Sequence, residues 1–246
     1  MLETFNPQNL SNTAWAYAKV GFYEGALFDA LARVVSAPRV LAVFTPQNVA
    51  NLAWAVARRL TEGPEVTDAH QKALYFDCLR AICESVVAEG LPTSLDQFRP
   101  QNLASLLHSL AVTGFACPPL FEAAPHHFAT ILEDCNAQDI SNTVWSYVSL
   151  GVDNFLVFDC VDRFLARGPV PGHFGAQNVA NLAWSFAKAG RGSDAFFQRL
   201  ADRAADIAAE FSNQNCSNPC GNQPLVWGVP TKLEKSRARS NRSRFG

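Results

Sequence analysis

A 17-residue pattern occurs five times in this chain and sets the framework for everything else in it. The most complete copy runs from Phe174 to Gly190 and reads FGAQNVANLAWSFAKAG, while a copy that starts at Phe211 breaks off after Asn218. The marker glutamines recur at steps of 37 to 39 residues, with one step of 54. They are Gln8, Gln47, Gln101, Gln138 and Gln177, with Gln214 in the broken copy. This period is typical of helical hairpins stacked into a solenoid.

Each copy has the start, the apolar stripe and the end of an amphipathic helix. Proline stands one residue before the glutamine in three copies, where its fixed φ and missing N–H suit the first helical position. Asn6 and Thr45, before two of these prolines, are good N-caps. Leu10, Ala14 and Ala18 recur at the helical period. Glycines at the ends supply the left-handed residue that closes a helix, at Gly21, Gly114, Gly151 and Gly190.

A second, less regular helix follows each glycine, as in residues 26–35 and 195–205. We therefore predict an all-α fold, an α-solenoid of about five helix-turn-helix repeats of 37–39 residues spanning residues 1–218. The units begin near residues 5, 44, 98, 135 and 174, with a truncated sixth at 211. The second unit contains an insertion of roughly 15 residues, and its polar stretch 61–71 predicts a loop between the two helices.

Tryptophan and amide side chains recur at fixed distances from the marker glutamine. Tryptophan follows by seven residues at Trp15, Trp54, Trp145 and Trp184, and His108 takes this place in the third copy. Asparagine follows by four residues at Asn12, Asn51, Asn142 and Asn181, with Ser105 in the third copy. The tryptophans suit either base stacking or packing between helices, and their place beside the apolar stripe favours packing. The repeated amides favour hydrogen-bond ladders between stacked repeats over ligand recognition.

The last residues differ in character from the repeats. Pro219 falls where a helix should continue, and residues 219–246 have no apolar period. This segment is either a disordered basic tail or an out-of-frame sequence, and the abrupt loss of the repeat favours the second interpretation. Six of the 20 basic residues and one of the 22 acidic residues lie in 230–246, which leaves 14 against 21, or about −7, for the rest. An acidic body argues against strong non-specific binding to phosphates.

Catalytic, metal and membrane signals are weak. The seven cysteines include no CxxC pair, which indicates reduced thiols and no zinc site. The chain has no phosphate-binding glycine loop, GxSxG or HExxH motif, so we expect no enzyme, no catalytic residues, no metal and no cofactor. Its apolar runs are shorter than the roughly 18 residues that span a bilayer, so we expect no membrane association. No transit peptide is visible before the first copy, and the abrupt start predicts a fragment of a longer array.

The pattern FxPQNLxNxAWAxAKxG, followed by ALFDAL, resembles the octotricopeptide-type helical repeats of organellar proteins. It is also similar to repeats of the kinetoplastid RNA-editing substrate-binding complex and to the helical region of FAST-kinase-like proteins that precede a RAP domain. The resemblance covers about residues 5 to 218. It implies binding of single-stranded RNA in the mitochondrial matrix or a plastid, with a role in RNA processing, stability or editing, and protein partners from an RNA-processing complex.

Under this resemblance, residues that vary between copies and can form hydrogen bonds are the candidates for reading RNA. They fall at the start of the first helix or four residues after the tryptophan: Asn6, Lys19, Thr45, Arg58, Arg99, Asn136 and Lys188. The alternative is a protein–protein scaffold, because the solenoid fold does not determine the function. Basic residues that converge on one groove favour RNA, whereas an acidic or apolar groove favours a protein partner.

Overall fold

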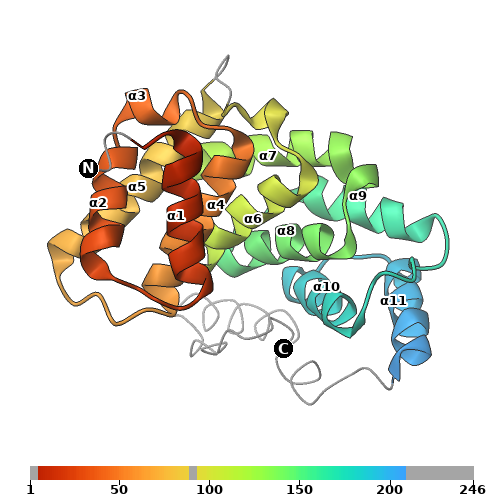
Figure 1. The fold of residues 1–246 in the computed structure, drawn as a ribbon. Helices are drawn as coiled ribbons and strands as arrows, with labels where there is room; N and C mark the ends of the chain where they lie inside the picture. Colours follow the sequence, from red (N-terminus) through yellow and green to blue (C-terminus); the bar gives the residue numbers. More distant parts are fainter. Residues whose placement is uncertain (1–4, 89–92, 209–246) are drawn as a thin grey trace, which may run out of the picture.

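Two layers of stacked helices make up the fold of the computed structural model, which describes residues 5–88 and 93–208 (Figure 1). The A helices are α1 (Pro7–Lys19), α4 (Pro46–Thr61), α6 (Pro100–Val112), α8 (Ala137–Leu150) and α10 (Ala176–Ala189). The B helices are α2 (Gly25–Val35), α5 (Ala69–Val87), α7 (Pro118–Ile131), α9 (Phe155–Ala166) and α11 (Asp194–Asp206). Short connectors are α3 (Pro38–Leu41), η2 (Leu95–Gln97) and η3 (Leu132–Asp134).

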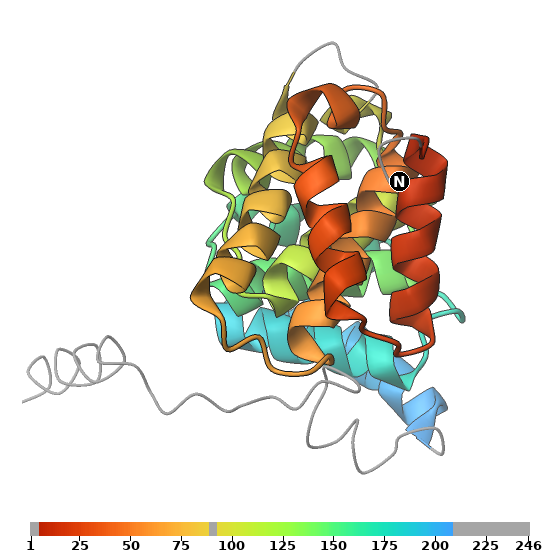
Figure 2. The same cartoon turned by 60° about the vertical axis from the view of Figure 1, so that its left-hand side comes forward.

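Each A helix packs against the next A helix, and each B helix packs against the next B helix. The two layers lie side by side along the stack, and the views in Figures 1 and 2 show the pairs following one another from α1 to α11. This arrangement confirms the predicted all-α fold and its solenoid class. The broken copy at 211–218 and the segment 219–246 lie outside the described residues, so the proposed boundary at residue 218 stays a prediction.

The starts of the A helices follow the cap and proline chemistry of the sequence. Pro7, Pro46 and Pro100 each occupy the first helical position. The Asn6 side chain accepts a hydrogen bond from the backbone N–H of Asn9 at 2.8 Å, and Thr45 caps α4 in the same way. These bonds satisfy backbone donors that a helix leaves open at its start.

The ends of four A helices are closed by glycines in the left-handed region, with φ between 63° and 72°. At Gly21, its own N–H donates to the carbonyl of Ala18 and the next N–H donates to Tyr17, which is the pair of bonds that defines a Schellman motif. The same pair of bonds recurs after α6, α8 and α10. The chain therefore reverses into each following B helix through the same turn.

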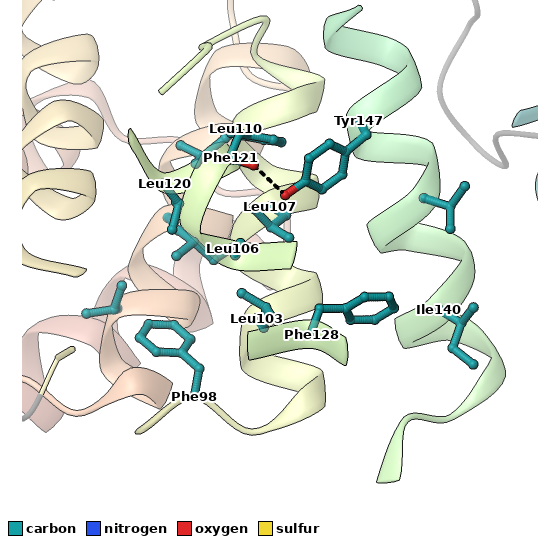
Figure 3. Packing of buried hydrophobic residues seen from close by; sticks show 14 of the residues in the cluster. Phe98, Leu103, Leu106, Leu107, Leu110, Leu120, Phe121, Phe128, Ile140 and Tyr147 are labelled. Atoms are coloured by element: carbon teal, nitrogen blue, oxygen red, sulfur yellow. Dashed lines mark hydrogen bonds between the residues drawn. The ribbon is translucent and has the colours of Figure 1, made fainter. Parts of the chain in front are cut away.

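The core lies between the two layers and runs through the stack (Figure 3). Tyr147 of α8 is fully buried, and its hydroxyl donates to the carbonyl oxygen of Phe121 on α7 at 2.9 Å. Leu107 and Leu110 of α6 lie beside this bond (Figure 3). One helix of each layer is thus joined to the other by a buried bond inside an apolar cluster.

The loop predicted between the two helices of the second unit is present but shorter than residues 61–71. Because α4 extends to Thr61 and α5 begins at Ala69, residues 62–68 form the connection. Asp68 caps α5 by accepting from the N–H groups of His70 and Gln71. The sequence prediction missed this cap, and the extra residues mainly lengthen the two helices of this pair.

Candidate functional site

One side of every A helix carries the repeated glutamine, asparagine and tryptophan. The asparagine follows the glutamine by four residues, the tryptophan follows the asparagine by three, and a further position follows the tryptophan by four. Residues at these steps lie on the same side of an α-helix. On α1 this side carries Gln8, Asn12, Trp15 and Lys19. The equivalent residues are Gln47, Asn51, Trp54 and Arg58 on α4; Gln101, Ser105, His108 and Val112 on α6; Gln138, Asn142, Trp145 and Ser149 on α8; and Gln177, Asn181, Trp184 and Lys188 on α10. We call these residues the tryptophan face.

The aromatic rings of the tryptophan face are only partly covered. Trp15 is 40% exposed and Trp54 and Trp184 are half-buried, whereas Trp145 is 6% exposed. The predicted packing role therefore holds fully for Trp145 alone. The reason is that Leu10 and its counterparts point into the core, whereas the tryptophans lie farther round the A helices, so that Trp54 and Trp184 pack against the core with only part of their surface.

Neighbouring rings on the face lie close to one another across helix boundaries. The rings of Trp15 and Trp54 have their centroids 6.1 Å apart and are tilted by 32°. The rings of His108 and Trp145 are 5.0 Å apart. Such spacings are within the favourable range for aromatic pairs. The rings thus form a discontinuous platform that crosses the A layer.

A cation lies over the tryptophan on three of the A helices. The Lys19 ammonium is 6.0 Å from the Trp15 ring centre, and the Lys188 ammonium is 4.7 Å from that of Trp184. The Arg58 guanidinium is 4.9 Å from the Trp54 ring centre and also pairs with Glu62. Lys19, Arg58 and Lys188, which were predicted to contact RNA, are therefore placed beside aromatic surface by the one-turn spacing of the helix.

A hollow of about 430 Å³ lies on the tryptophan face where α6, α8 and α10 meet. Its lining is uncharged and consists mainly of amides, with one histidine and one tryptophan: His108, Gln138, Ser141, Asn142, Trp145, Gln177, Asn178 and Asn181. The amide of Gln177 donates to the side-chain oxygen of Asn181 at 2.9 Å, which orients both groups. The sequence interpretation missed this hollow, although the shared helical side of its residues was visible in their spacing.

The two rings in the hollow are neutral at pH 7, and the indole nitrogen of Trp145 is shielded from water. Burial lowers the pKa of His108 to about 4, so its imidazole is uncharged at neutral pH. The indole Nε1 of Trp145 is buried and has no hydrogen-bond partner among the described residues. A buried donor of this kind is costly unless it finds an acceptor. The hollow is therefore suited to uncharged polar groups with aromatic faces rather than to phosphate.

Two hydrogen bonds between stacked A helices join residues other than the marker glutamines. Asn48 of α4 donates to the Ser11 hydroxyl of α1 at 3.0 Å, and Asn178 of α10 donates to Ser141 of α8 at 3.1 Å. These residues lie one and three positions after the glutamine. Four of the five glutamines are exposed, at Gln8, Gln47, Gln101 and Gln138. The hydrogen bonds between repeats that were expected from the glutamines are thus made by the residues one and three positions after them, because those residues face the adjacent helix.

The other candidate residues lie at the opposite edge of the A layer. Asn6, Thr45 and Asn136 cap their helices, and their side-chain oxygens accept backbone N–H groups. Arg99 occupies the cap position of α6 without a side-chain cap bond and is exposed. This edge is roughly 20 Å from Lys19 and Lys188, the length of a 13-residue helix. The seven candidates therefore do not form one cluster.

Charge is divided unequally between the two layers. The A helices carry one acidic residue, Asp139, which is buried at 6% exposure and completes the cap of α8. The B helices carry nine acidic residues: Asp29, Asp77, Glu84, Glu122, Asp159, Asp162, Asp194, Asp202 and Asp206. Among the helices of the described residues, the acidic side chains thus lie mainly in the B layer, while Glu62, just after α4, pairs with Arg58 of the tryptophan face.

The described part of the chain offers neither a metal site nor a spanning segment. No group of three or more histidine, cysteine, aspartate or glutamate side chains within 5–88 and 93–208 is arranged to hold a metal ion. In the same residues, no helix combines the length and apolarity needed to cross a membrane.

The stacked helix pairs define a helical-repeat protein of the α-solenoid class. A family model described as RNA-editing substrate-binding complex 6 protein matches residues 92–219, just over half of the chain. The chain belongs to this family. Membership connects it with RNA editing in mitochondria, and the matching family is not a family of enzymes. The match supports the RNA-editing part of the resemblance and leaves its FAST-kinase-like part unconfirmed.

Proposed function

We propose that this chain is a non-catalytic subunit of a mitochondrial RNA-editing complex and that it binds single-stranded RNA across the tryptophan face. The observation that carries the proposal is the composition of this face. It combines three partly or largely exposed tryptophans, three cations and rows of amides, and the one carboxylate that pairs with these cations is Glu62 beside Arg58.

The chemistry of each group fits a part of a single-stranded nucleic acid. Bases of every kind stack on aromatic rings, each contributing about 1–3 kcal/mol. Amides of asparagine and glutamine form hydrogen bonds to the edges of unpaired bases. Lys19, Arg58 and Lys188 supply charge for phosphates next to these rings.

Within this proposal, the neutral hollow binds a base and the cations bind the backbone. Trp145 offers an unpaired N–H donor, and Asn142 and Gln138 offer amides beside it. Because no lysine or arginine lines the hollow, a phosphate has no partner there. Adjacent A helices are about 8–10 Å apart, a spacing that suits extended rather than stacked nucleotides.

The experiment is fluorescence anisotropy of the full chain with a randomised single-stranded RNA pool at two salt concentrations. All variants carry glutamine at the six basic positions between 232 and 244, so that the C-terminal residues do not contribute. The test variant has alanine at Lys19, Arg58 and Lys188. The matched control has alanine at Lys72, Arg80 and Arg163, which removes the same charge from the B helices.

We expect the test variant to bind at least about tenfold more weakly and to lower the salt slope by about 2, since each lost phosphate contact contributes about 0.7. The control should bind like the parent. Trp184→Ala should weaken binding by about fivefold or more through lost stacking. Absence of saturable binding at micromolar protein, or equal losses in test and control, would contradict the proposal and favour a protein scaffold.

A further inference from the structure

The residue that precedes each B helix is of a different kind at α7. On α2, α5, α9 and α11 the N-cap side chain carries an oxygen that accepts a backbone N–H of its own helix: Glu24, Asp68, Asn154 and Ser193. The N-cap of α7 is Cys117, whose thiol makes no cap hydrogen bond. A sulfur therefore occupies this position, where the open N–H groups and the positive end of the helix favour a negative charge.

A second thiol lies in contact with Cys117. Cys83 of α5 is buried at 1% exposure, and its side chain is hydrogen-bonded to that of Cys117. The contact follows from the packing of α5 against α7. Phe76, two turns before Cys83 on α5, has its ring centroid 5.8 Å from that of Phe115, just before α7. The packing of two units thus brings together two cysteines that are far apart in the sequence.

These contacts give the two thiols different properties. The hydrogen bond from Cys83 and the nearby N–H of Leu120 lower the pKa of Cys117, although its partial burial and the charge of Glu84 act in the opposite direction. The same hydrogen bond and burial raise the pKa of Cys83. Cys117 is half-buried, so a small reagent reaches it, whereas Cys83 is enclosed. One thiol is therefore suited to react with an external reagent, and the other to react with the product.

The other cysteines of the described residues lack this combination. Burial raises the pKa of Cys78 and of Cys135 to about 12, and that of Cys160 to about 11. Thiols with such values stay protonated at neutral pH and are poor nucleophiles. Within residues 5–88 and 93–208, Cys117 is thus the cysteine whose surroundings favour the thiolate.

We propose that Cys117 and Cys83 are an oxidation site at which hydrogen peroxide converts two thiols into a disulfide between α5 and α7. The Cys117 thiolate attacks one oxygen of the peroxide, so that an S–O bond forms, the O–O bond breaks, and the departing hydroxide takes up a proton and leaves as water. The Cys83 sulfur then attacks the sulfur of the Cys117 sulfenic acid. An S–S bond forms, the S–O bond breaks, and the oxygen leaves with the Cys83 proton as a second water. The two thiols lose two electrons, which the peroxide gains.

The disulfide fixes the junction between the second and third helix pairs. It links α5 to α7 where they pack, and it closes residues 83–117 into a loop that contains α6. A bond that closes a loop of this length stabilises the folded chain mainly by restricting the unfolded one. The inference does not depend on RNA binding, because neither cysteine lies on the tryptophan face.

The test uses the full chain with Cys216→Ser and Cys220→Ser, so that thiols outside the described residues do not contribute. The reduced chain is treated with an equimolar amount of hydrogen peroxide, and its peptides are mapped by mass spectrometry without reduction. Dimedone is added in parallel to label sulfenic acid. The test variants are Cys83→Ala and Cys117→Ser. The matched control is Cys160→Ser, because Cys160 is also half-buried in the B layer.

We expect the oxidised parent to yield one linked pair of peptides that holds Cys83 and Cys117, and to melt about 5 °C or more above the reduced chain. Dithiothreitol should reverse both changes. Cys83→Ala should accumulate a dimedone-labelled Cys117, Cys117→Ser should leave Cys83 reduced, and Cys160→Ser should behave like the parent.

A second measurement on the reduced parent needs no variant. At pH 7, iodoacetamide should modify Cys117 at least about tenfold faster than Cys160, because the thiolate is the reacting form. Equal rates at these two cysteines would overturn the proposal. Oxidation of Cys117 without a link to Cys83, or a disulfide that joins two chains instead, would also overturn it.

Discussion

His108 occupies on α6 the position that holds tryptophan on the other four A helices of the described stack. Its ring packs 5.0 Å from that of Trp145, and burial lowers its pKa to about 4. Below its ordinary pKa of about 6.5, the unfolded chain binds a proton that the folded chain does not bind. The free energy of unfolding therefore rises with pH between about 4 and 6.5 and is independent of this group above that window.

We expect His108→Trp to remove this dependence, which amounts to about 3 kcal/mol by pH 4. Urea unfolding at pH 7, 6 and 5 gives the free energy of unfolding at each pH. The parent and the variant are then compared by how steeply this free energy changes with pH. His70→Gln is the control, because His70 is exposed. An equal pH dependence of the free energy of unfolding in the parent and in His108→Trp would show that the imidazole takes up its proton in the folded chain.

Asn136 tests whether the caps of the A helices serve folding or recognition. Its side chain accepts from the N–H groups of Gln138 and Asp139 at 2.8 and 2.9 Å. We expect Asn136→Ala to lower the free energy of unfolding by about 1 kcal/mol and to leave RNA affinity unchanged. Arg99→Ala, at a position without a side-chain cap bond, should not change stability. Weaker RNA binding by Asn136→Ala at unchanged stability would restore the reading role.

At the scale of elements, the turns after the A helices were predictable and the contacts between helices were not. Glycine at a fixed distance from the glutamine specifies a left-handed residue whatever surrounds it, so Gly21 and Gly151 were placed correctly from local chemistry. The exposure of Trp15 and the bond from Asn48 to Ser11 depend on which helix lies alongside. The repeat period of the sequence predicts that another A helix lies alongside, but it does not predict which side of the helix contacts it.

The glycine turns also allow a clean test of backbone strain. Gly151 has φ of 67°, and a Cβ added there meets nothing within 4 Å. We expect Gly151→Ala to lower the free energy of unfolding by about 1–2 kcal/mol through backbone conformation alone. Gly168→Ala is the matched control, since its Cβ also meets nothing and its φ is not positive. Thermal or urea unfolding of both measures the difference, and equal effects would contradict it.

At the scale of the whole molecule, each helix pair contacts mainly the pairs before and after it. The stability of such an array is close to the sum of the stabilities of its repeats and of the interfaces between neighbours. A destabilising substitution in the terminal pair should therefore loosen that pair alone, whereas one in the middle should also loosen the pairs on both sides. The acidic B layer and the neutral or basic tryptophan face also belong to this scale. The sequence total of about −7 concealed this division, because net charge carries no information about layers.

Two identical substitutions at different places in the stack test this local behaviour. Leu200→Ala removes a buried side chain from α11, and Leu107→Ala removes one from α6 in the middle. Each should cost about 2–5 kcal/mol locally. We expect hydrogen exchange to speed up mainly in α11 for the first variant, and from α4 to α8 for the second. Uniform acceleration in both would indicate a single cooperative unit.

The bonds from Asn48 to Ser11 and from Asn178 to Ser141 each join residues 37 positions apart, across the boundary between two units. Exchange of whole units that begin at residues 5, 44, 98, 135 and 174 therefore separates each serine from its own asparagine. A duplicated block that runs from Leu10 to Asn48 instead carries both partners together. For a gene that grows or shrinks by duplication, a block that begins and ends inside the A helices thus preserves these two contacts, and positions 11 and 48 are expected to change together in descendants.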